Sequence, residues 1–115
     1  MVREVGSEMT KERLRDYRAI AQEKKALEHQ IETDDLVAGH QALVELYQDK
    51  MDRMAEELMA IEQAIDRLPV RERAILRRYY IQGMTWEEVC VAEHYSWRQV
   101  HRIHARALEL LREEA

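Results

Sequence analysis

The fold is decided by residues 83–108, GMTWEEVCVAEHYSWRQVHRIHARAL, in which two helix starts follow each other closely. Thr85 is followed three residues later by Glu88, and Ser96 is followed three residues later by Gln99. This is the spacing of a capping box, in which the side chain of each residue hydrogen-bonds to the backbone of the other. The stretch therefore predicts one short helix and one longer helix, joined by a tight turn at His94 and Tyr95.

A further helix is expected directly before this stretch. Pro69 suits a first helical turn, and its ring biases Leu68 away from helical geometry, so it separates two helices. Gly83 is a natural left-handed helix stop. Between them an amphipathic pattern includes Tyr79 and Tyr80, at least one of which must face inward. The last 46 residues are thus predicted to hold three helices, at about 70–82, 86–93 and 97–113.

Residues 1–67 predict two long helices. The first begins near Ser7 or Thr10, either of which can cap it, and runs to about Glu32. Its apolar stripe is interrupted by Lys24. The second carries apolar residues at alternating steps of three and four, which is a heptad seam: Val44, Tyr47, Met51, Met54, Leu58, Ile61, Ile65 and Leu68.

A narrow seam of this kind is typical of a coiled coil. The simplest partner is the first helix, folded back as an antiparallel hairpin. The alternative is a parallel homodimer that closes through the same seam. Together the two halves predict an all-α fold, with a hairpin over 1–67 for oligomerisation or partner contact and a helix-turn-helix domain over 68–115.

Composition and charge narrow the class of protein. Charged residues make up 36% of the chain, with 3 Gly and 1 Pro, which favours long helices. No apolar run approaches a membrane span, no signal-peptide core is present, and one cysteine permits no internal disulfide, so we expect a cytoplasmic protein without membrane contact. Residues 1–67 hold 10 Lys/Arg and 16 Asp/Glu, whereas residues 68–115 hold 8 Arg and 7 Glu. The acidity therefore belongs to the N-terminal half.

The expected last helix has a core face and a polar face. The core face consists of Val100, Ile103, Ala107, Leu108 and Leu111, and the opposite face of Arg98, Gln99, His101, Arg102, Ala105 and Arg106. Arg and Gln can contact guanine and adenine edges bidentately, and the second helix of a helix-turn-helix lies in the major groove. Residues 94–108 contain no acid. A solvated face is the ordinary explanation of such a stripe, but an anionic partner explains the absence of acids better.

Three linked segments carry a resemblance to a known family. They are residues 68–80 (LPVRERAILRRYY), 83–89 (GMTWEEV) and 96–108 (SWRQVHRIHARAL). Together they resemble region 4 of sigma-70-type factors. With the long helical N-terminal part, the chain looks still more like the small region-4-like regulators of phages and prophages of Gram-positive bacteria, the ArpU and RinA type of late-gene activators.

The resemblance implies a function and a set of site residues. In sigma factors the equivalent of the helix after Ser96 contacts the promoter −35 element, and the domain docks on RNA polymerase. Double-stranded DNA and RNA polymerase are therefore the expected partners. The implied DNA-binding residues are Thr85, Trp86, Ser96, Trp97, Arg98, Gln99, His101, Arg102 and Arg106. Trp97 and His101 stand where housekeeping sigma factors carry arginine, so the promoter sequence bound by those factors is not carried over to this chain. Nothing in the sequence resembles the other sigma regions, which excludes a complete sigma factor.

Other chemistry has weaker support. Cys90, His94, His101 and His104 could be taken for a zinc site, but their spacing fits structural zinc patterns poorly. Cys90 is better explained as a small core residue, and His94 and His101 as facing DNA or solvent. Trp86 and Trp97 each allow a DNA-facing or a half-buried role. The adjacent acid pairs lack a nucleophile with its base or a phosphate loop, so we expect no enzymatic activity, no metal and no cofactor.

Two alternatives to a DNA-binding transcription regulator remain open from the sequence. One is an interaction module that binds RNA polymerase or a sigma factor and has little DNA affinity. The other is the small DNA-recognition subunit of a phage terminase, which also joins a helix-turn-helix to oligomerising helices.

Overall fold

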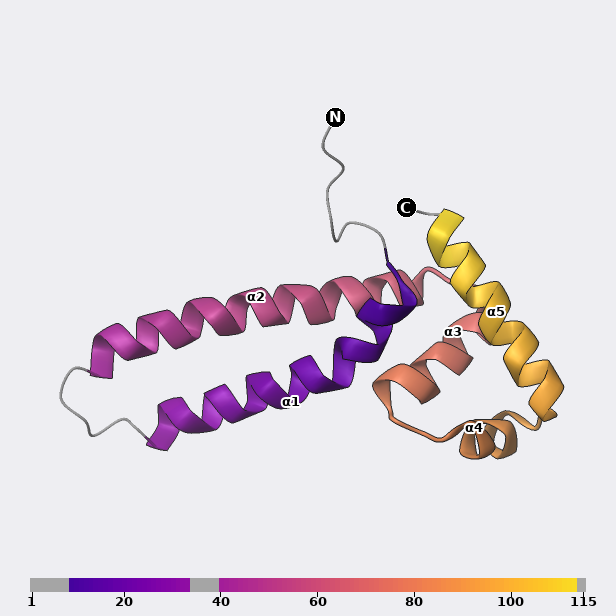
Figure 1. The fold of residues 1–115 in the computed structure, drawn as a ribbon, viewed down its shortest axis with the longest axis horizontal. Helices are drawn as coiled ribbons and strands as arrows, with labels where there is room; N and C mark the ends of the chain where they lie inside the picture. The colour runs from indigo at the N-terminus through magenta and orange to yellow at the C-terminus, as the bar shows by residue number, and fades with distance from the viewer. Residues whose placement is uncertain (1–8, 34–39, 114–115) are drawn as a thin grey trace.

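The computed structural model describes residues 9–33 and 40–113. Its helices, in chain order, are α1 (Lys11–Thr33), α2 (His40–Asp66), α3 (Val70–Leu76), the π-helix η1 (Arg77–Ile81), α4 (Trp86–Glu93) and α5 (Trp97–Glu113). No strand occurs in the described ranges, so the prediction of an all-α fold is confirmed. The last three predicted helices match the observed bounds closely. Of the two caps expected for the first helix, Thr10 accepts a hydrogen bond from the Arg13 amide at 3.2 Å, and Ser7 lies outside the described residues. Figure 1 shows the long α1–α2 hairpin projecting from a compact group of short helices.

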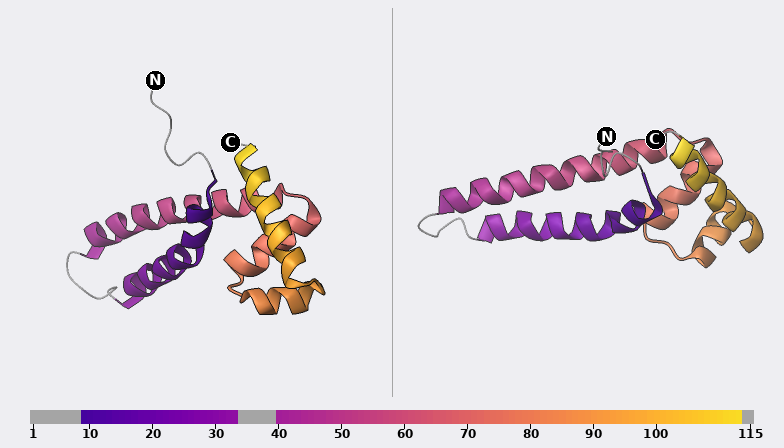
Figure 2. Two further views of the ribbon diagram at one scale, coloured as in Figure 1. Left: turned by 45° about the vertical axis from the view of Figure 1, so that its right-hand side comes forward. Right: turned by 45° about the horizontal axis from the view of Figure 1, so that its top comes forward.

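The hairpin is closed within the chain. α1 and α2 run antiparallel and lie side by side in all the views of Figures 1 and 2. The seam residues Met51, Ile61 and Ile65 are buried, as are Leu14 and Leu27 on α1. The apolar seam predicted on the second helix therefore packs on α1, which is the antiparallel alternative left open by the sequence.

A fork of hydrogen bonds fixes the register near the base of the hairpin. Arg13 donates from Nε to Glu57 Oε1 at 2.9 Å and from Nη2 to Glu57 Oε2 at 3.1 Å. A bidentate arginine–carboxylate pair has more geometric specificity than a single contact. This pair therefore helps to hold α1 in one position along α2.

The base of the hairpin and the short helices share one hydrophobic core. It is built from α1, α2, α3, η1 and α5 and from the residues next to them: Met9, Leu14, Ile61, Ala64, Ile65, Leu68, Leu76, Tyr80, Ala107 and Leu111. A buried apolar side chain contributes about 1.5–3 kcal/mol relative to an exposed one. The hairpin is therefore packed onto the C-terminal helices rather than tethered to them.

A second core cluster lies inside the C-terminal helices. Ile75 of α3, Val89 of α4 and Val100 and Ile103 of α5 are its buried members. Pro69 stands directly before α3, as expected, and the Arg73 amide donates to its carbonyl at 2.9 Å in the first turn. This cluster holds α4 and α5 against α3.

The third predicted helix changes character half-way. It is α-helical up to Leu76 and becomes a π-helix over η1. In a π-helix the rotation about the helix axis from one residue to the next is smaller than in an α-helix, so two successive tyrosines can both pack inward. Tyr80 is 3% exposed, and the Tyr79 ring meets it edge-on at 4.9 Å. The expectation that at least one of the two tyrosines faces inward is confirmed.

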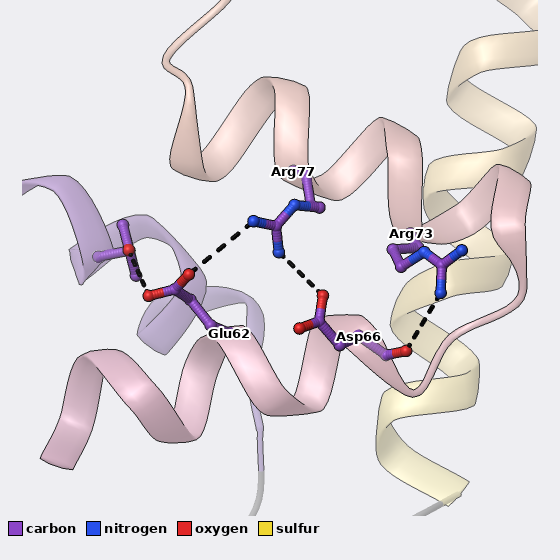
Figure 3. A network of polar contacts seen from close by, with 5 residues as sticks. Glu62, Asp66, Arg73 and Arg77 are labelled. Atoms are coloured by element: carbon purple, nitrogen blue, oxygen red, sulfur yellow. Dashed lines mark hydrogen bonds and ion pairs between the residues drawn. The ribbon is translucent and has the colours of Figure 1, made fainter.

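A polar network joins the hairpin to α3 and η1, as Figure 3 shows. Arg77 donates to Asp66 Oδ1 at 2.9 Å and lies 3.9 Å from Glu62 Oε1. Glu62 also accepts a hydrogen bond of 2.9 Å from the hydroxyl of Tyr17. Burial, together with this bond to a carboxylate, raises the pKa of Tyr17 to about 12. Arg73 donates to the backbone carbonyl of Asp66 at 3.5 Å, which ties the linker to α3.

Contacts with α1 and η1 position the two ends of α4. Gly83 has a φ of 76°, the left-handed geometry predicted for it, and a Cβ at this position would overlap the guanidinium of Arg18 on α1. At the other end of α4, Glu93 accepts a hydrogen bond of 2.6 Å from Arg78 Nε of η1. Both ends of α4 are therefore positioned by the scaffold and not by the loop alone.

Candidate nucleic-acid interface

Both capping boxes predicted from the sequence are present. At the start of α4 the Glu88 amide donates to Thr85 Oγ1 at 3.2 Å, and the Thr85 amide donates to Glu88 Oε1 at 2.9 Å. This backbone hydrogen bond lowers the pKa of Glu88. At α5 the Gln99 amide donates to Ser96 Oγ at 3.2 Å, and the Ser96 amide donates to Gln99 Oε1 at 2.8 Å. Thr85 and Ser96 are exposed beside these helix N-termini, where backbone dipoles favour an anion.

The turn between α4 and α5 is short and well defined. His94 has a φ of 59°, in the left-handed region, and caps α4 as the predicted turn residue. The Tyr95 amide donates to the Cys90 carbonyl at 3.1 Å, which closes the end of α4. An eight-residue helix, this turn and a seventeen-residue helix give the arrangement of a helix-turn-helix.

α5 has the two faces that its sequence predicts. Val100, Ile103, Ala107 and Leu111 are buried against the scaffold. The outward face is exposed along its length and carries five of the expected contact residues: Trp97, Arg98, Gln99, Arg102 and Arg106. Arg106 lies 3.4 Å from Glu109 one turn on, whereas Arg98 and Arg102 have no ion pair within the described residues. The N-terminal half of this face is therefore cationic and open.

A hollow of about 260 Å³ lies beside this face, between α5 and the start of α3. Three arginines line it, Arg71 from α3 and Arg102 and Arg106 from α5, together with Tyr95, Gln99, Ile103 and one acid, Glu72. Arg71 was not among the residues expected from the sequence. No local pattern distinguishes it from other helix arginines, because its place in the interface depends on how α3 packs against α5.

The two tryptophans have different surroundings. Trp86 stacks on Tyr79 with ring centroids 3.8 Å apart and an interplanar angle of 12°, and it is half-buried. Trp97 is 53% exposed, and its ring lies 4.3 Å from that of His101. Of the two roles considered for each, Trp86 has the half-buried role of an anchor, whereas Trp97 is available on the outer surface.

The two histidines of α5 have different surroundings. His101, expected to face DNA or solvent, is half-buried: its ring lies beside those of Trp86 and Trp97, and its Nε2 is buried with no hydrogen-bond partner among the described residues. His104 is 8% exposed, and its Nε2 is 2.8 Å from the hydroxyl of Tyr80. Its burial, reinforced by the charge of Lys11, lowers the pKa of His104 to about 4. His104 is therefore neutral and part of the core.

The zinc alternative gains no geometric support. Within the part of the chain that the structure describes, no three His, Cys, Asp or Glu side chains come together in a group that could hold a metal ion. Cys90 is half-buried and packs against the second core cluster. The same described residues include no helix long and apolar enough to cross a membrane.

Comparison with known proteins agrees with this geometry. Residues 64–113 match the family model of sigma-70, region 4, from the last turn of α2 to the end of α5. No curated protein and no solved structure shows a significant match to the chain. Over these residues the chain carries a sigma-70 region 4-like helix-turn-helix, a DNA-binding region found in transcription regulators.

Proposed function

We propose that this protein is a transcription regulator of the phage and prophage type, which binds promoter DNA by placing α5 in the major groove. The observation that carries the proposal is the outward face of α5, on which Arg98, Gln99 and Arg102 are exposed near the helix start. Side chains in this part of a recognition helix reach base edges first. The adjacent hollow adds Arg71 as a phosphate contact on the flank of the same surface.

Two of the expected contact residues have an altered role in this proposal. Trp86 and His101 pack on each other, with ring centroids 4.8 Å apart, so they support the surface and do not contact bases.

Gln99 and Trp97 keep groups that can contact DNA. Gln99 uses its amide oxygen in the capping box, which leaves its amide nitrogen to donate. Trp97 offers an exposed ring beside the N-terminus of α5, where it can pack against the DNA backbone or a thymine methyl group.

The test compares DNA binding of Arg102→Ala with that of a matched control, Arg53→Ala. Arg53 is an exposed arginine of α2 whose side chain pairs with Asp49, away from α5. Each variant is titrated at fixed salt with duplexes from the protein's own upstream region and with shuffled duplexes of equal composition. Loss of one bidentate base contact corresponds to about 1–3 kcal/mol, or roughly a five- to 150-fold weaker affinity for the specific duplex only. Equal affinity of all three proteins for both duplexes would contradict recognition through α5.

Contact with RNA polymerase is a second part of the proposal. It is supported by the exposed acids along α1, Glu12, Asp16 and Glu23, which would be repelled by DNA and suit a protein partner. The side chain of Val91 on α4 is also 75% exposed. Retention of polymerase core on the immobilised full-length protein, reduced by Val91→Asp or by Asp16→Lys, is the expected result. Failure of core polymerase to bind the wild type at low salt argues against this part alone.

A further inference from the structure

One flank of α1 carries a row of cations that lie outside the candidate DNA interface on α5. Lys11, Arg15, Arg18 and Lys25 share a helix face, with Gln22 and His29 continuing the same steps of four and three residues. Glu12, Asp16 and Glu23 fall on another side of the helix, and Glu28, three residues after Lys25, pairs with Lys24. We refer to Lys11, Arg15, Arg18 and Lys25 as the cationic flank of α1.

None of these four cations has an ion-pair partner among the residues of the described ranges. Other cations of the hairpin do: Arg13 pairs with Glu57, Lys24 with Glu28, Lys50 with Glu23 and Arg53 with Asp49. Arg15, Arg18 and Lys25 are also exposed. In a chain of net charge −5, four aligned cations without ion-pair partners in the described ranges suit an external anion.

The cationic flank begins next to the candidate DNA interface. Lys11 lines a groove of about 420 Å³ together with Ala105 and Arg112 of α5, and two acids, Glu12 and Glu109, line the same groove. The charges of Lys11 and Arg15 act on His104 of α5, which places both near that helix. Arg18 lies over Gly83, in the loop that leads to the Thr85 cap of α4. From there α1 runs outward, away from the short helices (Figure 1).

We propose that the cationic flank of α1 binds the sugar-phosphate backbone of the DNA that extends beyond the site under α5. This inference rests on the proposed function, since it extends the same DNA complex. Arg15 and Lys25 are ten residues apart, about 15 Å along a helix, a length over which duplex DNA carries roughly nine phosphate charges. A regular row of anions adjoining the helix-turn-helix is what duplex DNA supplies. The added contacts would supply electrostatic affinity that residues 68–115, with a near balance of 8 Arg and 7 Glu, provide only weakly.

The test is the salt dependence of DNA binding by full-length variants. The flank variant replaces Arg15, Arg18 and Lys25 by Gln. Its matched control replaces three exposed cations of α2 and its end, Lys50, Arg53 and Arg67, by Gln, and therefore has the same net charge. Both are measured on a duplex that covers only the α5 site and on one extended by about ten base pairs on each side, roughly one helical turn.

The expected result is specific to the flank variant and the long duplex. Each lost phosphate contact lowers the slope of log affinity against log salt by about 0.9, so the slope should fall by about 2–3. Between 50 and 200 mM salt, a slope change of that size corresponds to roughly a 16- to 60-fold change in relative affinity. The control variant should keep the wild-type slope on both duplexes. A variant with Lys at positions 15 and 18 and native Lys25 should restore the wild-type slope, which separates charge from folding.

The outcomes distinguish this inference from the proposed function. If Arg102→Ala loses specific binding while the flank variant behaves like the control, the flank inference is overturned and recognition through α5 stands. If wild-type protein binds neither duplex, both are overturned. Capture of the wild type by vesicles of anionic lipid, lost in the flank variant while its DNA slope is unchanged, would assign the flank to another partner and also refute the inference.

Discussion

The buried His104 gives a prediction about how stability depends on pH. Its Nε2 lies 2.8 Å from the Tyr80 hydroxyl, it is 8% exposed, and burial lowers its pKa from 6.5 to about 4. Between these two values the unfolded chain holds a proton that the folded protein does not. The stability associated with neutral His104 is therefore fully present above the unfolded pKa and is lost as the pH falls toward the folded pKa.

The size of this loss follows from the two pKa values. For a group with a pKa of 6.5 when unfolded and about 4 when folded, acidification from about pH 7.5 to about pH 5 removes about 2 kcal/mol of stability. The loss levels off at about 3 kcal/mol below the folded pKa. Urea unfolding followed by circular dichroism across this pH range measures the free energy directly.

His104→Gln is the informative variant, and His29→Gln is its control. Glutamine can keep a hydrogen bond to the Tyr80 hydroxyl but does not titrate, so its stability should fall with acidification by about 2 kcal/mol less than that of the wild type. His29 is exposed on α1, and its replacement should leave the wild-type pH dependence unchanged. If wild type and His104→Gln lose the same stability between the two pH values, the reasoning about a neutral, buried histidine is wrong.

Three further predictions concern the elements that hold the helix-turn-helix together. Gly83→Ala should cost about 1–2 kcal/mol, because the new Cβ meets a left-handed backbone and the Arg18 guanidinium; an unchanged urea midpoint refutes this. Thr85→Ala removes one capping box and should cost about 1 kcal/mol, whereas Thr85→Ser should cost much less in the same assay. Trp86→Ala should lower stability by about 2 kcal/mol or more because it removes the stacking on Tyr79, while Trp97→Ala should change stability by less than about 1 kcal/mol. Comparable thermal midpoints for the two tryptophan variants would contradict their different surroundings.

Local sequence signals predicted much of the C-terminal fold. The capping pairs Thr85–Glu88 and Ser96–Gln99 place two helix starts to the residue, because their hydrogen bonds depend only on a spacing of three. Pro69 and Gly83 act through their own backbone preferences, so the helix start at Pro69 and the helix end at Gly83 could also be predicted from the sequence. The heptad seam of α2 predicted a helical partner, but a seam does not distinguish a partner in the same chain from one in another chain.

Features that depend on packing between distant segments were not predictable. The place of His104 in the core follows from η1 packing on α5, and polar His101 likewise lies between two tryptophans contributed by two helices. The π-helix itself has no residue signature that separates it from an ordinary α turn, so a continuous helix over 70–82 was expected. Arg71 joins the hollow beside α5 through a tertiary contact, and its sequence neighbourhood resembles any charged helix start.

The shared core under the hairpin has a geometric consequence for any complex on DNA. Because α2 is anchored by Ile61, Ile65 and Leu68, its 27 residues extend in a fixed direction over about 40 Å. That length corresponds to slightly more than one turn of duplex, which advances about 34–36 Å per ten base pairs. A second DNA-binding protein bound to the His40 end of α2 would thus be held at a fixed distance from the bases under α5. If the DNA site of that second protein were moved by half a helical turn, the site would face the opposite side of the duplex.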